Sequence, residues 1–195
     1  MPALFVTGPP GSGKTTLVMR AAEELKRRGL RVGGMVSREV RRGGARWGFE
    51  IVDLLTGRTG VLASVEQPRG PSVGKYRVNL SDLESVGVEA IRRAVELCDV
   101  VVVDEVGPME LFSEPFKQAV REALSSGKLV LGTVHFRARG GLVDEIKGGR
   151  GVVLITLTRE GREEASRRFL EEALAMASRL GGVGQRTLKT PSASC

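Results

Sequence analysis

Several kinds of residue are scarce in this chain of 195 residues, and each scarcity excludes a class of protein. Two cysteines are too few for a disulfide framework or a zinc site. No apolar run approaches the ~20 residues of a membrane-spanning helix. The opening segment MPALFVTGPP lacks the basic start of a secretory signal. We therefore expect a cytoplasmic protein that does not associate with a membrane.

Amide side chains are also rare, with one Asn and three Gln in the chain, which is typical of proteins from thermophiles. Basic side chains are in excess: 30 Lys and Arg face 23 Asp and Glu, for a net charge of +7. Such a charge suits anionic partners, either nucleotide phosphates or nucleic acid, and does not choose between them. Cys98 lies among apolar residues and is expected to be a buried small hydrophobe, whereas Cys195 is expected to be a free thiol.

Apolar runs alternate with amphipathic segments along the chain. Strands are expected at residues 3–7, 31–40, 45–55, 58–62, 100–104, 129–134 and 152–156, and helices at 15–28, 81–98, 114–126 and 159–180. A capping-box pattern, Ser81 to Glu84, opens the second helix. The alternation predicts an α/β fold with a mostly parallel central sheet and helices on both faces, extended by a β-hairpin. We expect one domain over residues 1–180 and a disordered basic tail over 181–195.

A phosphate-binding motif follows the first predicted strand. The run Gly8, Pro9, Pro10, Gly11, Ser12, Gly13, Lys14 and Thr15 fits G-x-x-x-x-G-K-[ST] and opens a helix. Glycines let the backbone N–H groups point at phosphate oxygens, and the helix adds the positive end of its dipole. Lys14 is expected to reach the β- and γ-phosphates, and the Thr15 hydroxyl to ligate Mg²⁺. Thr16 completes the expected nucleotide-binding segment.

Two adjacent carboxylates, Asp104 and Glu105, end the most apolar strand of the chain. In P-loop enzymes an Asp at the end of a neighbouring strand holds Mg²⁺, a role that Asp104 fits. Glu105 at the turn of the chain would orient and deprotonate an attacking water, as a general base does. The alternative is an ordinary pair of surface carboxylates. A water-activating group beside the γ-phosphate favours hydrolysis over phosphate transfer to an acceptor.

Four segments resemble the small thermostable nucleoside-triphosphatase family of archaea and bacteria, whose vertebrate relative is called cancer-related nucleoside-triphosphatase. They are the phosphate loop, residues 39–49, residues 73–80, and the run Asp104-Glu105-Val106-Gly107-Pro108-Met109-Glu110-Leu111. The resemblance implies a RecA-like P-loop fold and slow Mg²⁺-dependent hydrolysis of ATP, GTP and other nucleoside triphosphates, with low base selectivity. It also implies that Val106 and Gly107 belong to the nucleotide site. Vertebrate relatives carry Lys where this chain has Pro108, which leaves one source of positive charge open.

Weaker candidates surround these motifs. Arg38, Arg41 and Arg42 lie near the hairpin turn, where a solvated basic tip competes with a phosphate or nucleic-acid contact. Trp47 and Tyr76 are expected to pack rather than to stack on bases.

Three further candidates follow the strand over residues 129–134. Arg137 and Arg139 would stabilise charge as an arginine finger does, or lie free in a loop. His135, the only histidine, would sense the γ-phosphate or cap its strand.

The sequence thus predicts a monomeric hydrolase that converts nucleoside triphosphates to diphosphates and phosphate, with Lys14 and Glu105 as catalytic residues. A nucleotide or small-metabolite kinase and a nucleotide-gated nucleic-acid-binding protein are the alternatives.

Overall fold

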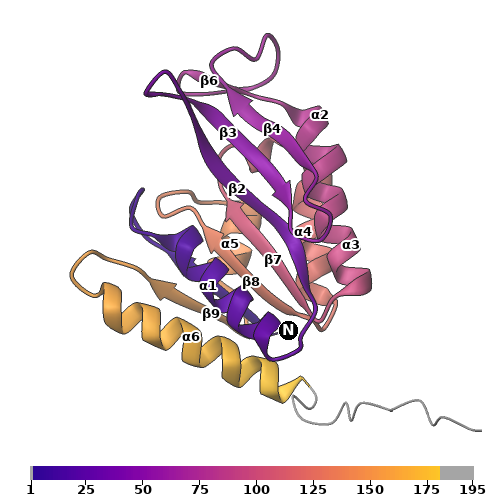
Figure 1. The fold of residues 1–195 in the computed structure, drawn as a ribbon, viewed down its shortest axis with the longest axis vertical. Helices are drawn as coiled ribbons and strands as arrows, with labels where there is room; N and C mark the ends of the chain where they lie inside the picture. Colours follow the sequence, from indigo (N-terminus) through magenta and orange to yellow (C-terminus); the bar gives the residue numbers. More distant parts are fainter. Residues whose placement is uncertain (1, 181–195) are drawn as a thin grey trace, which may run out of the picture.

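The computed structural model describes residues 2–180, which form one nine-stranded sheet covered by helices (Figure 1). The tail over 181–195, for which disorder and the free thiol of Cys195 were expected, lies outside the described residues. Across the described part of the chain, no helix is both long enough and apolar enough to cross a membrane.

Five strands form the parallel half of the sheet. Their order is β2 (Val32–Arg42), β7 (Val100–Val106), β8 (Leu129–Val134), β1 (Ala3–Thr7) and β9 (Val152–Thr156). Helices cover both faces here, so β1 and β8 are buried along their whole length, and β7 is buried at all residues but one. This burial explains their continuous apolar runs.

The other half of the sheet is antiparallel and continues from β2 through β3 (Ala45–Asp53), β4 (Thr59–Ser64), β6 (Tyr76–Val78) and β5 (Ser72–Val73). The predicted hairpin is confirmed as β2 and β3, joined by a turn at Gly43 and Gly44. The extension is larger than expected, because it also contains β5 and β6, where no strand was predicted. In Figure 1 these strands rise above the parallel half.

The helices divide between the two faces of the sheet. One face is covered by α1 (Lys14–Arg27) and α6 (Arg162–Arg179), which bury Leu25 and Phe169 against it. The other face is covered by α3 (Glu89–Leu97), α4 (Glu114–Ser125) and α5 (Gly141–Gly148). Cys98 is buried in the second layer as predicted, and this burial raises the pKa of its thiol. The expected α/β fold is confirmed.

Two expectations about helices need correction. The helix expected to open on a Ser81–Glu84 capping box begins at α2 (Leu80–Asp82), because the Asn79 side chain accepts the Asp82 N–H at 3.2 Å. It then continues through a π-helical segment, Leu83–Val88, into α3. Helix α5 was not predicted. Glycines at both ends give its eight residues the composition of a loop.

Candidate active site

The phosphate motif forms the strand–loop–helix unit that its spacing predicted. Strand β1 ends at Thr7, and α1 begins at Lys14 with Gly13 before it at a φ of 97°. The Lys14 ammonium donates to the carbonyl oxygens of Gly8 and Pro9 at 3.1 and 3.3 Å. Its charge therefore lies over the loop, where the β- and γ-phosphates of a nucleotide would bind.

The other loop residues differ in exposure. Pro9, Pro10, Gly11, Thr15 and Thr16 are exposed at the rim. Ser12 is buried, and its hydroxyl has no hydrogen-bond partner within the described residues. Most of the expected phosphate-binding segment is thus open to a ligand.

Asp104 lies on β7, and the structure corrects the expectation that its strand borders β1. Strand β8 lies between them. Thr133 of β8 donates its hydroxyl to Asp104 Oδ1 at 2.6 Å, and both side chains are fully buried. The other carboxylate oxygen, Oδ2, has no hydrogen-bond partner among residues 2–180.

Burial raises the pKa of Asp104 to about 6, although the hydroxyls of Thr133 and Thr15 and the Lys14 ammonium act to lower it. A buried carboxylate with one free oxygen, close to a threonine hydroxyl, matches the oxygen ligands that Mg²⁺ prefers. No group of three or more His, Cys, Asp and Glu able to hold a metal occurs in the described part of the chain. The residues therefore fit a cation whose other ligands are mostly oxygens of water and of phosphate.

Glu105 is partly buried between β7 and the phosphate loop, and its peptide bond with Asp104 is cis. It lines one hollow with Gly8, Lys14 and His135. Burial raises the pKa of Glu105, whereas Lys14 lowers it. A higher pKa makes a carboxylate a stronger base, so this placement suits the activation of water.

Glu110 is a buried carboxyl group that the sequence analysis quoted only as part of a motif. A Cβ added to Gly107 would lie 3.3 Å from Glu110 Oε2 and 3.3 Å from Glu105 Oε1. The two carboxyl groups therefore flank the same face of Gly107. Burial, with the charges of Glu105 and Asp104, raises the pKa of Glu110 to about 8. The sequence does contain an indication of this burial, because Glu110 is the single acid among apolar residues, between Met109 and Leu111.

His135 and Arg137 lie where the sequence placed them, in the loop after β8, and both line the hollow that contains Glu105. The His135 Nδ1 accepts the Ala138 N–H at 3.1 Å. The neutral ring can therefore donate only through Nε2. Burial and the cations Lys14, Lys147 and Arg137 lower the pKa of His135, which favours that neutral form. Arg139 does not line this hollow.

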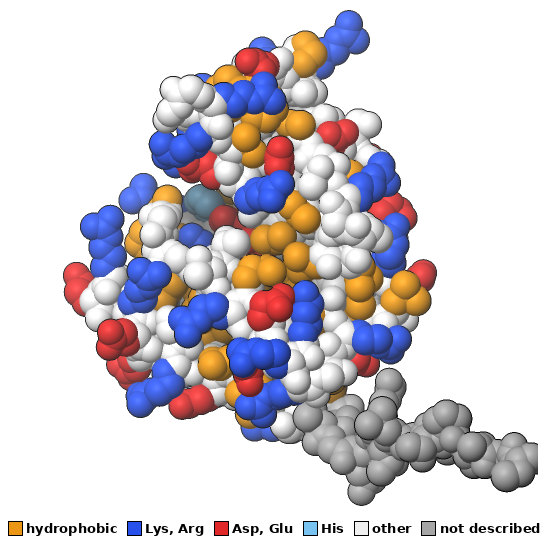
Figure 2. Space-filling model, in the orientation of Figure 1, with side chains coloured by type: hydrophobic (Ala, Val, Ile, Leu, Met, Phe, Trp, Pro, Cys, Tyr) orange, Lys and Arg blue, Asp and Glu red, His pale blue; other side chains and the backbone are white. Residues whose placement is uncertain are grey.

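The antiparallel extension forms a second wall of the site. Arg38, Glu39, Arg46 and Phe49 line a hollow together with the phosphate loop and Glu105. Figure 2 shows the surface hollowed between the extension and the body below it, with side chains of both charges on the walls.

The arginines near the hairpin turn are paired with carboxylates. Arg38 binds Glu50 through two nitrogens, at 3.0 and 2.9 Å. Arg41 pairs with Glu39 at 2.7 Å, and Arg42 with Glu66 at 3.1 Å. These pairs favour a solvated tip over a phosphate contact.

The two aromatic residues singled out in the extension pack as expected. The Arg42 guanidinium lies 3.6 Å from the centre of the Trp47 ring, and Tyr76 meets Phe49 edge to face at 5.2 Å.

A parallel strand that enters a glycine-rich phosphate loop, with an acidic strand end two strands away, defines a P-loop nucleotide-binding protein. Comparison with known proteins narrows this class. A family profile described as NTPase matches residues 3–170, so the chain belongs to this family.

Two relatives and two solved structures agree with this assignment. The nucleoside-triphosphatase THEP1 of Thermofilum pendens is 49% identical over 90% of this chain and 97% of its own. The nucleoside-triphosphatase THEP1 of Methanosarcina acetivorans is 45% identical over 83% of this chain and 90% of its own. The crystal structure of THEP1 from Aquifex aeolicus superposes with a TM-score of 0.75 at 34% identity, covering 87% of this chain and 97% of its own. The solution structure of a human cancer-related nucleoside triphosphatase has a TM-score of 0.73 at 38% identity. The match covers 88% of this chain and 96% of the human one.

Proposed function

We propose that this chain hydrolyses nucleoside triphosphates to diphosphates and phosphate, with Mg²⁺ as cofactor and little preference for the base. The observation that carries the proposal is the meeting of Glu105, Lys14 and the phosphate loop in one hollow. An acid able to activate water there lies next to the cation expected to hold the γ-phosphate.

Each residue has a definite task in this mechanism. The backbone N–H groups of residues 8–16, except those of Pro9 and Pro10, which have none, and the Lys14 ammonium hold the phosphates. Val106, the last residue of β7, and Gly107 follow Glu105 in the chain and complete the nucleotide site. Thr15 and Asp104 would hold the cation, which when bound neutralises charge on the transferring phosphoryl group. Glu105 orients a water for attack in line with the leaving oxygen and accepts its proton.

His135 and Arg137 would stabilise the negative charge of the transition state at the γ-phosphate end of the triphosphate. Both line the hollow beside Glu105. Hydrogen bonds and charge aimed at the transferring group act more strongly in the transition state than in the ground state. Arg137 would therefore supply positive charge in this chain, which has Pro108 where vertebrate relatives carry Lys.

The test is release of phosphate from ATP, GTP, CTP and UTP with Mg²⁺, for the wild type, Glu105→Gln and a control, Glu96→Gln, at an exposed position of α3. We expect similar release from all four by the wild type and the control. The Glu105→Gln variant should bind nucleotide and release little phosphate, and chelation by EDTA should abolish release. Undiminished release by Glu105→Gln would remove its role as the base.

The alternatives predict other outcomes of the same assay. Tight binding without release by the wild type would point to a kinase that lacks its acceptor. Stimulation of release by RNA or DNA, with a steep salt dependence, would point to a nucleic-acid-binding protein. The ion pairs of the hairpin arginines speak against the latter. The cytoplasmic location and the monomeric state stay predictions.

A further inference from the structure

The order of the strands sets the direction in which a nucleoside triphosphate would lie across the site, because the acids and the phosphate loop lie on different strands. Asp104 and Glu105 lie near the end of β7, and β8 separates β7 from β1. Strand β9 borders β1 on the opposite side, where the Leu157 N–H donates to the Thr7 carbonyl at 2.7 Å. If the γ-phosphate lies by Glu105, as the proposed function requires, the nucleoside end lies on the side of β9 and α6.

Arg162, in the first turn of α6, covers the phosphate loop on that side. A Cβ added to Gly13 would lie 3.1 Å from Arg162 Nη2, 3.5 Å from Cζ and 3.8 Å from Nε. The guanidinium group therefore lies against Gly13, the residue that precedes α1. No carboxylate lies within 4.0 Å of its nitrogens in the part of the chain that the structure describes.

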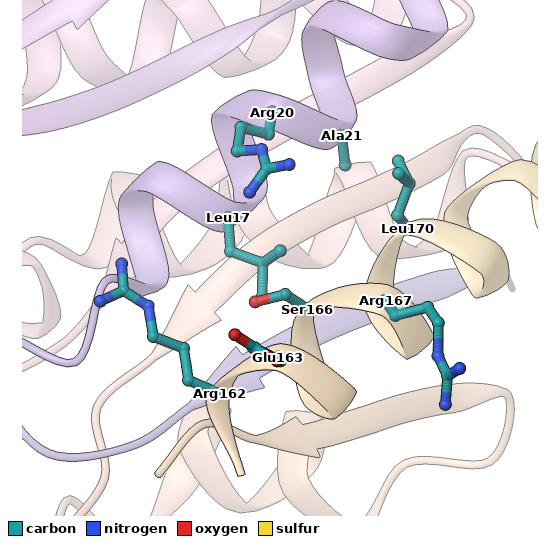
Figure 3. A pocket seen from close by; sticks show the side chains of 8 residues that line it. All are labelled: Leu17, Arg20, Ala21, Arg162, Glu163, Ser166, Arg167 and Leu170. Atoms are coloured by element: carbon teal, nitrogen blue, oxygen red, sulfur yellow. The ribbon is translucent and has the colours of Figure 1, made fainter. Parts of the chain in front are cut away.

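A groove between α1 and α6 continues from this point (Figure 3). Its arginines and apolar residues are Leu17, Arg20, Ala21, Arg162, Arg167 and Leu170. Arg20 also lines an adjoining hollow with Thr15 and Thr16, so the groove is continuous with the end of the phosphate loop. In Figure 3 the Arg162 side chain extends from the start of α6 toward the start of α1.

The chemistry of this groove suits the flat faces of a nucleoside and not the edge of a particular base. Guanidinium planes stack on aromatic rings, and aliphatic side chains contact their faces. The remaining lining groups are Glu163 and Ser166, and Asn and Gln, which read base edges in pairs of hydrogen bonds, do not line the groove. Binding here would favour nucleotides over bare phosphates without choosing among bases.

We propose that the groove between α1 and α6 holds the nucleoside end of the nucleoside triphosphate, with the Arg162 guanidinium stacked on the base or ribose. The inference rests on the proposed function, because that function sets the direction of the triphosphate. It adds a site for a moiety that the phosphate loop does not contact.

The test compares binding of ATP, GTP and inorganic tripolyphosphate, measured by calorimetry with Mg²⁺, and every protein also carries Glu105→Gln to prevent turnover. The proteins are the wild type, Arg162→Ala, Arg162→Lys and a control, Arg168→Ala, at an exposed position of α6 outside the groove. We expect the wild type to bind both nucleotides more tightly than tripolyphosphate. Arg162→Ala should weaken ATP and GTP alike by roughly 3- to 30-fold, the range of a cation–π contact, and leave tripolyphosphate within twofold.

Three results would overturn the inference. Equal loss for all three ligands would place Arg162 on the phosphates. Full rescue by Arg162→Lys would mean that its charge alone matters, since Lys lacks the planar group. Equal affinity of the wild type for ATP and tripolyphosphate would remove the nucleoside site while the hydrolase stands. Absence of binding to any of the three, with no phosphate release, would instead refute the proposed function itself.

Discussion

Replacing Glu110 by Gln is expected to remove part of the pH dependence of stability, because Gln keeps the shape of the protonated acid and cannot ionise. Glu110 is 4% exposed, and burial together with Glu105 and Asp104 raises its pKa from 4.5 to about 8. Its protonated form is therefore the one that the folded protein favours.

The sign of the effect follows from proton binding in the two states. Above pH 4.5 the unfolded chain releases the Glu110 proton, whereas the folded protein keeps it up to about pH 8. The contribution of Glu110 to the free energy of unfolding is thus complete below pH 4.5 and is lost as the pH rises to about 8. Each pKa unit corresponds to about 1.4 kcal/mol, so the whole interval is worth roughly 5 kcal/mol as an upper value.

Guanidinium unfolding followed by circular dichroism at several pH values from about 5 to 8 would measure this contribution. The wild type should lose stability relative to Glu110→Gln by roughly 3 kcal/mol over that range. Glu96→Gln, which removes an exposed carboxylate, is the control and should follow the wild type. A constant difference between Glu110→Gln and the wild type at every pH would refute the reasoning, because it would mean that Glu110 ionises in the folded protein as it does in the unfolded chain.

Three further changes test other parts of the structure. Lys14→Ala should weaken ATP binding in calorimetry and lower phosphate release by about 100-fold or more, since it removes the cation of the phosphate loop. Thr133→Val removes the donor to Asp104 Oδ1 and should lower the free energy of unfolding by about 1–3 kcal/mol at pH 8. The loss should shrink at pH 5, where Asp104, with a pKa of about 6, is protonated. Ser113→Ala removes the cap that accepts the Phe116 N–H at 3.1 Å and should cost about 1 kcal/mol in the same unfolding assay.

The features that the sequence predicted well are those carried by neighbouring residues. The phosphate loop, strand β7 and helix α4 each depend on a short run, and each formed where it was expected. Helix α5 was missed because eight residues between glycines carry too weak a period to be distinguished from a loop.

Features that depend on the order of strands could not be read from the chain. Nothing in the run from Val100 to Glu105 indicates that β8 enters between β7 and β1. The Thr133 hydrogen bond to Asp104 and the approach of Arg162 to Gly13 both follow from this order. Burial of Glu110 likewise depends on the packing of distant segments, so its raised pKa has no local signal.

The electrostatics of the site explain why substrate and cation should bind together. Burial raises the pKa of Asp104, Glu105 and Glu110, and the Lys14 ammonium opposes the rise at Asp104 and Glu105. Arg38 of the opposite wall is already paired with Glu50. A triphosphate would bring several more negative charges to a hollow with little unpaired positive charge near Asp104. A divalent cation carried by the nucleotide, as the proposed function requires, would supply the missing charge and would favour the ionised form of Asp104, the residue proposed to hold it.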